Sequence, residues 1–170
     1  EAYCIASRYR RDWMNARASL VDSWRLISFN ANSLESDLDL VFAGDIVEYK
    51  SACYCGDAHF ADWPATLRRL DAVKAEALVP GRGDALVGAD RVSEGVALTR
   101  DFLHDTYAPV KRGVARGATL KECFDEATAA MRPKYGSWPI FEHCQPFNVA
   151  RAFDEAQGID TPRIWTAERD

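Results

Sequence analysis

The pattern of apolar and polar positions is sharpest from residue 38 onward. Residues 38–43 form a short, mostly apolar run that ends at Gly44-Asp45, as is typical of a buried strand reaching a loop. Residues 46–49 are predicted to continue briefly in extended conformation. A second apolar run over residues 77–81 predicts another short strand, which ends in the turn Gly81-Arg82-Gly83.

A helix is predicted between these two strands. Asp62 and Pro64 are typical of a helix start, and Leu67, Leu70 and Val73 follow at helical spacing as a buried stripe. The order strand, helix, strand indicates a βαβ unit, in which functional side chains tend to gather at the carboxyl ends of the strands.

Further helices follow the second strand. Apolar residues at three- and four-residue steps predict a long helix from Asp90 to Val114, with a kink or break near Tyr107 because Pro109 lies inside it. A capping box at residues 119–122 predicts a helix that continues to about residue 131, and a last helix is expected over residues 148–157. Near the N-terminus, only a rough apolar face suggests a helix over residues 7–26.

Composition narrows the classes of protein that fit. The length of 170 residues, 48% hydrophobic content and 28% charged content fit one folded globular domain. A net charge of −5 gives no basic surface of the kind that nucleic acid requires, and no apolar stretch is long enough to cross a membrane. The five cysteines are an odd number, which favours a reducing compartment and hence a cytoplasmic location.

Several motifs occur together in a characteristic order. They are Leu40-Val41-Phe42-Ala43-Gly44-Asp45, the helix around Trp63-Pro64-Ala65-Thr66-Leu67, and Leu78-Val79-Pro80-Gly81-Arg82-Gly83. This order resembles the second half of the metallo-β-lactamase-fold metallo-hydrolases, in which a strand ends in Gly-Asp and the next strand ends in Pro-Gly-His-Gly. The resemblance covers about residues 36–170, including the tail Trp138-Pro139-Ile140-Phe141-Glu142-His143, and leaves residues 1–35 as a divergent N-terminal segment.

The resemblance carries expectations about fold and chemistry. It implies an α/β (α+β) fold, a half or divergent version of an αββα sandwich with a mixed sheet flanked by helices. It also implies a zinc-dependent hydrolase that acts on a small-molecule substrate and holds one or two metal ions. By the same resemblance Asp45 is the metal ligand, while Arg82 would orient an anionic group of the substrate and His143 would lie on the substrate side. No residue is assigned to the catalytic step itself.

Each of these residues also has a structural alternative. Asp45 could close a turn after its strand, and Arg82 could cap its own turn through an ion pair with Asp84 or Asp57. His143, beside Glu142, could serve as a general base or proton shuttle, but the favoured alternative is a hydrogen-bonded structural histidine.

The rest of the family's ligand set is missing. The first-half signature His-x-His-x-Asp-His is absent, and the chain's three histidines are His59, His104 and His143. Arg82 stands where the family has its last histidine, and arginine cannot ligate a cation. A chain that opens with Glu1 rather than Met fits a truncated or rearranged product. We therefore expect an incomplete or divergent hydrolase that is inactive alone.

Two further alternatives remain open. The chain could instead be a non-catalytic, self-associating or ligand-binding domain, because half of a sandwich exposes a sheet face that must be covered by a homodimer partner, by the missing N-terminal half or by residues 1–35. In that case the sheet and the helix over residues 90–114 would form the interface. A separate zinc site could be built from thiols and imidazoles. Its candidate ligands are Cys53, Cys55, His59, His143 and Cys144.

Overall fold

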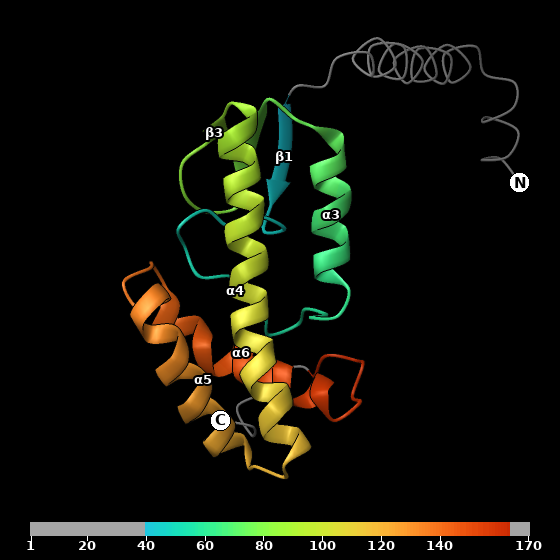
Figure 1. Cartoon of the computed structure of the whole chain (residues 1–170), viewed down its shortest axis with the longest axis vertical. Helices are drawn as coiled ribbons and strands as arrows, with labels where there is room; N and C mark the ends of the chain where they lie inside the picture. The colour runs from blue at the N-terminus through green and yellow to red at the C-terminus, as the bar shows by residue number, and fades with distance from the viewer. Residues whose placement is uncertain (1–39, 164–170) are drawn as a thin grey trace, which may run out of the picture. The chain divides into compact units, whose positions relative to one another are not determined.

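The computed structural model describes residues 40–163, which form a small three-stranded mixed sheet and four helices (Figure 1). The elements, in chain order, are β1 (Leu40–Gly44), α3 (Trp63–Val73), β2 (Ala77–Pro80), β3 (Leu86–Val87), α4 (Ala89–Ala115), α5 (Leu120–Tyr135) and α6 (Phe141–Ala156). The fold is therefore mixed α/β. The helix predicted over residues 7–26 lies outside the described residues. None of the helices within residues 40–163 is both long and apolar enough to cross a membrane.

The sheet contains the predicted βαβ unit. β1 and β2 are parallel and joined through α3, with Val41 opposite Leu78. The two-residue strand β3, which the sequence did not indicate, pairs antiparallel with β2. The prediction of extended structure at residues 46–49 is wrong. The chain turns there instead, because the amides of Ile46 and Val47 donate back to the carbonyls of residues 43 and 44.

Helix α3 begins where the sequence predicted, with Pro64 in its first turn and Asp62 as the residue before it. The Asp62 side chain makes no capping hydrogen bond. Leu67 is fully buried, whereas Leu70 is half-buried and Val73 is exposed. The buried stripe of α3 is thus narrower than its spacing suggested.

Helix α4 is the centre of the packing, since it contacts α3, α5, α6 and two strands of the sheet (Figure 1). α4 runs through Pro109 without interruption, so the helix has no break near Tyr107. Thr106 and Val110, on either side of that turn, are both buried, and their packing holds the helical path. Similarly, α5 passes Pro133 and α6 starts at Phe141 rather than at residue 148, with Phe141 buried.

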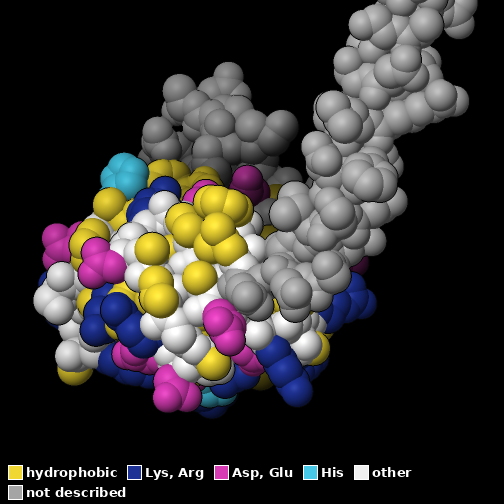
Figure 2. Space-filling model, turned by 90° about the horizontal axis from the view of Figure 1, so that it is seen from above, with side chains coloured by type: hydrophobic (Ala, Val, Ile, Leu, Met, Phe, Trp, Pro, Cys, Tyr) yellow, Lys and Arg dark blue, Asp and Glu magenta, His cyan; other side chains and the backbone are white. Residues whose placement is uncertain are grey.

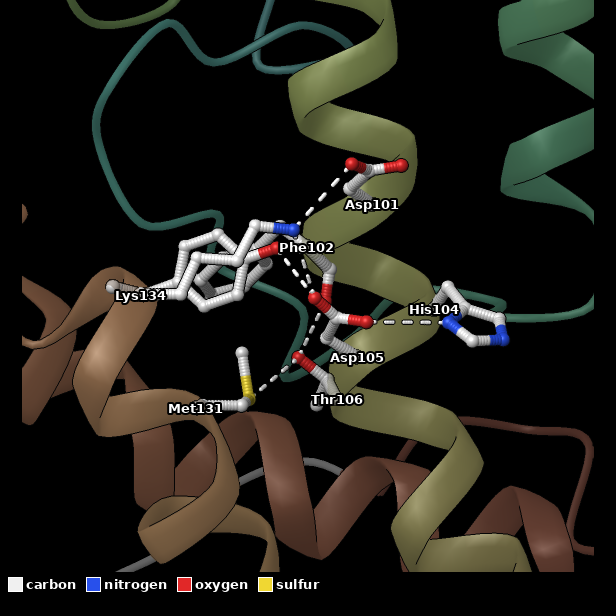
Figure 3. Close-up of polar contacts among 8 residues, drawn as sticks. Asp101, Phe102, His104, Asp105, Thr106, Met131 and Lys134 are labelled. Carbon is white, nitrogen blue, oxygen red and sulfur yellow. Dashed lines mark hydrogen bonds and ion pairs between the residues drawn. The ribbon is translucent and has the colours of Figure 1, made fainter.

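A polar network fastens α5 to α4 (Figure 3). The Tyr135 hydroxyl donates to Asp105 Oδ2 at 2.7 Å, and Lys134 Nζ lies 3.1 Å from the same oxygen and 3.4 Å from Asp101 Oδ2. Burial alone would raise the pKa of Asp105, but hydrogen bonds from Tyr135, Lys134 and His104 outweigh it and lower the pKa. His104 itself is exposed.

The two faces of the sheet differ sharply in burial. Leu78 and Leu86 lie on the face that packs against α4, and both are fully buried. The register places the alternate residues on the opposite face, which we call the bare sheet face. Its members are Leu40, Phe42, Ala77, Val79 and Val87. All are apolar, yet Phe42 is 77% and Val87 70% exposed. Figure 2 views the end of the molecule at which β1 begins and shows hydrophobic side chains gathered there.

Candidate functional site

The carboxyl ends of β1 and β2 bring Asp45 against the turn at residues 80–83. The parallel register sets Gly44 opposite Pro80, so the next residues of both strands meet. A Cβ at Gly81 would collide with Asp45 Oδ1 and would lie only 2.9 Å from the Asp45 amide nitrogen. Glycine is therefore required at position 81 for this close approach.

The same turn is hydrogen-bonded to the segment that follows Asp45. The Gly81 amide donates to the Val47 carbonyl at 3.0 Å, and the Tyr49 amide donates to the Arg82 carbonyl at 3.0 Å. Gly83 has a φ of +95°, and a side chain there would collide with the Tyr49 carbonyl. These contacts hold the Gly-Arg-Gly turn onto residues 45–49.

Arg82 forms an ion pair with Glu48 rather than with Asp84 or Asp57, the partners considered from the sequence. The Arg82 Nη1 atom donates to Glu48 Oε1. Glu48 is 1% exposed and Arg82 is 39% exposed, so the pair links a buried carboxylate to the surface. Glu48 Oε2 has no hydrogen-bond partner within residues 40–163. Arg82 thus supplies the counter-charge that a buried carboxylate requires.

The backbone of Glu48 is fixed from the other side by α4. The Thr99 hydroxyl accepts from the Glu48 amide at 3.1 Å and lies 3.0 Å from the Glu48 carbonyl, to which it donates. Burial raises the pKa of Glu48, Arg82 lowers it in part, and the negative charge of Asp45 raises it further, so that the net shift is upward. Asp45, Glu48 and Arg82 therefore form one electrostatic cluster at the strand ends.

The segment that carries the buried cysteines Cys53 and Cys55 is anchored to α6. The Asn148 side chain of α6 accepts from the Cys55 amide at 2.7 Å and donates to the Cys53 carbonyl at 2.8 Å. Both cysteines are free and buried, and burial is the main cause that raises the pKa of each thiol. Neutral thiols are poor metal ligands, because the metal binds the thiolate.

His143 lies on α6, exposed, with its ring centroid 6.1 Å from that of Phe147. Among the described residues, no contact joins His143 to Asp45 or Arg82. The structure therefore brings together two of the three predicted site residues. It also adds Glu48, whose only sequence signal was a charge between the apolar neighbours Val47 and Tyr49.

The zinc ion that the resemblance implies would need several ligating side chains at the strand ends. Within residues 40–163, no group of three or more His, Cys, Asp or Glu side chains is arranged to hold a metal. At the cluster itself, the permanent cation of Arg82 already contacts Glu48, and a second cation beside it would be repelled. As they stand, the described residues do not fit a zinc ion.

Comparison of the sequence with models of known protein families gives no match, and comparison with curated proteins gives none either. The relationship to the metallo-β-lactamase fold stays a prediction that rests on the motifs quoted above.

The raised pKa of Glu48 predicts a pH-dependent difference between the protein and its Glu48→Gln variant. The folded protein binds this proton more tightly than the unfolded chain, so the stability from Glu48 is complete below the ordinary value of 4.5 and is lost as pH rises through the raised pKa. Urea unfolding from about pH 4 to about pH 8 should show the protein losing stability relative to Glu48→Gln.

Glu122→Gln is the matched control, and it should show the opposite trend. The Glu122 carboxylate accepts from the Thr119 amide, and this hydrogen bond is the main cause that lowers its pKa. Its contribution to stability is therefore present above the ordinary pKa and is lost as pH falls. A difference between the protein and Glu48→Gln that stays constant across this pH range would contradict the burial of Glu48.

Proposed function

We propose that the chain is the C-terminal half of a metal-dependent hydrolase of the metallo-β-lactamase superfamily, in an incomplete or divergent form that is inactive alone. The observation that carries this proposal is the contact of Gly81 with Asp45 at the adjoining ends of two parallel strands. An aspartate there faces the very turn in which the resembled family has its histidine. The bare sheet face supports the same proposal, since a sandwich buries that face against its other half.

Under this proposal, intact relatives hold zinc and act on a small-molecule substrate. Here Arg82 stands where the resembled family has its last histidine, and its guanidinium pairs with Glu48. Arg82 keeps 39% of its side chain exposed, which leaves part of the guanidinium free to orient an anionic group. His143 is exposed on α6 and would act, if it contacts substrate, at the edge of the site.

The experiment that tests this function is the substitution Arg82→His. The Arg82 side chain reaches Glu48, and the adjacent Gly81 lies against Asp45, so we expect an imidazole at position 82 to lie close to both carboxylates. We expect Arg82→His to bind Co²⁺ or Zn²⁺ at least about tenfold more tightly than the original chain, measured by titration calorimetry and by the Co²⁺ absorption spectrum.

The matched control is the double variant Arg82→His/Asp45→Asn, which should lose the gained affinity because the amide is a weaker metal ligand than the carboxylate. Equal metal affinity in Arg82→His and in this double variant would refute the assignment of Asp45. Stoichiometric zinc in the unmodified chain, lost on Asp45→Ala, would refute the claim that its site is incomplete.

A second candidate function is self-association through the bare sheet face. Its specific support is the exposure of Phe42 and Val87, whose size and apolar character are typical of an interface. The expectation that α4 forms part of such an interface is weakened, because α4 is already packed against three helices and the sheet.

Self-association predicts a homodimer whose formation depends on concentration and not on metal. Phe42→Lys should shift sedimentation velocity toward the monomer, because it places a charge on the apolar face that would form the contact. Leu120→Lys is the control, since Leu120 is exposed on α5, outside the bare sheet face. A monomer over a wide range of concentrations, with chelator or without it, would remove this candidate.

A further inference from the structure

A cleft separate from the strand ends lies between the start of α3 and the middle of α4. Its volume is about 550 Å³, within the range of roughly 300–1,000 Å³ that is usual for small-molecule sites. Phe60 and Pro64 form one wall, and residues 100–112 of α4 supply the other. Neither Asp45 nor Arg82 lines it, so the cleft is independent of the proposed function.

The floor of the cleft is apolar and aromatic. The rings of Phe60 and Tyr107 stack with centroids 5.2 Å apart, and Leu103 beside them is 1% exposed. Ala108, whose side chain is a single methyl group, also lines the cleft. Such a surface favours an apolar ligand body through burial of its area.

The wall that carries Phe60 is held in place from α6. The Glu155 carboxylate accepts from the amides of Phe60 and Ala61 at 2.9 and 2.8 Å, and Arg151 lies 3.1 Å from the same carboxylate. Arg151 also donates to the Ala58 carbonyl at 2.6 Å. Because the wall is fixed by these bonds, little ordering is required when a ligand enters.

The mouth of the cleft is basic. Arg100, Lys111 and Arg112 line it together with His104, and none of the nine lining residues is acidic. Figure 3 shows His104 on the side of α4 opposite α5. This is a local excess of positive charge in a chain whose net charge is −5.

Two of these cations have no acidic partner among the residues that the structure describes. Arg100 lies 3.7 Å from Asp71, but within residues 40–163 no carboxylate forms an ion pair with Lys111 or Arg112. Lys111 Nζ instead lies 5.3 Å from the Tyr107 ring centroid, directly above the aromatic floor. Positive groups of this kind at the rim of an apolar cleft complement a ligand that is anionic at one end.

We propose that this cleft binds an organic carboxylate with an apolar body. The hydrocarbon part lies over Phe60, Leu103 and Tyr107, and the carboxylate accepts hydrogen bonds from Lys111 and Arg112 at the mouth. The cationic rim selects an acid over the corresponding alcohol. The volume of the cleft limits the length of the hydrocarbon chain of the ligand.

Decanoate, used below its micellar concentration in buffer of low ionic strength, is the probe, and decanol is its neutral counterpart. Titration calorimetry should show saturable binding of decanoate, with decanol about tenfold weaker or more. Arg112→Glu and Lys111→Glu should each weaken decanoate binding by about tenfold and leave decanol unchanged. Arg68→Glu on α3 is the charge-matched control, since Arg68 is exposed and does not line the cleft.

A space-filling variant tests the floor separately from the charges. Ala108→Phe should abolish binding of both probes. Its far-ultraviolet circular dichroism spectrum is measured to check that the variant folds. The two charge reversals, at exposed positions, keep the test decisive if Ala108→Phe does not fold. Equal affinity for decanoate and decanol, the absence of saturable binding, or a loss in Arg68→Glu equal to that in Arg112→Glu would each overturn the proposal.

Discussion

The docking of the Gly-Arg-Gly turn onto residues 45–49 is the constraint on which the strand ends depend. Because Gly81 touches Asp45 and Gly83 passes over the Tyr49 carbonyl, a side chain at either glycine would push the turn away from β1. With the turn in place, Arg82 is directed at Glu48, which Thr99 holds against α4. One packing requirement thus connects both strands, the turn and the central helix.

The chemistry at this point is a charge pair rather than an open metal site. A buried glutamate requires either a proton or a cation, and the pKa of Glu48 is raised because the effect of burial exceeds the opposing effect of Arg82. Arginine provides a permanent charge and a planar fork, which suit the contact between this turn and Glu48. Under the proposed function, the Arg82–Glu48 pair would stand where an active relative has a metal ligand, and the bare sheet face would pack against another half.

Short sequence patterns predicted those helices and strands whose structure depends on residues close together in the chain. The apolar run that ends at Gly44-Asp45, the run over residues 77–81, and Pro64 at the start of α3 lie where the structure has β1, β2 and α3. The capping box at the start of α5 is present, with the Thr119 hydroxyl and the Glu122 carboxylate each accepting an amide hydrogen bond. In each case the neighbours that determine the structure lie a few residues apart.

What the sequence did not reveal depends on contacts between distant residues. α6 starts at Phe141 because that residue is buried in the core, although Pro146 within the helix disfavours helix by its local preference. Arg82 and Glu48 are 34 residues apart in the chain, and Asn148 and Cys53 are 95 residues apart. No local sequence pattern indicates such partners. The sequence likewise did not indicate the basic cleft, since Phe60 and Lys111 line it together only because distant segments of the chain pack against each other.

The most direct test of the account is a double-mutant cycle between Glu48 and Arg82, with Glu48→Ala, Arg82→Ala and the double variant compared by urea unfolding at neutral pH. If Arg82 is the counter-charge of a buried Glu48, the coupling free energy should exceed about 1 kcal/mol, a figure already reduced for the partial exposure of Arg82. Effects that add to within about 0.3–0.5 kcal/mol would show that the two residues act independently, and would contradict the central claim.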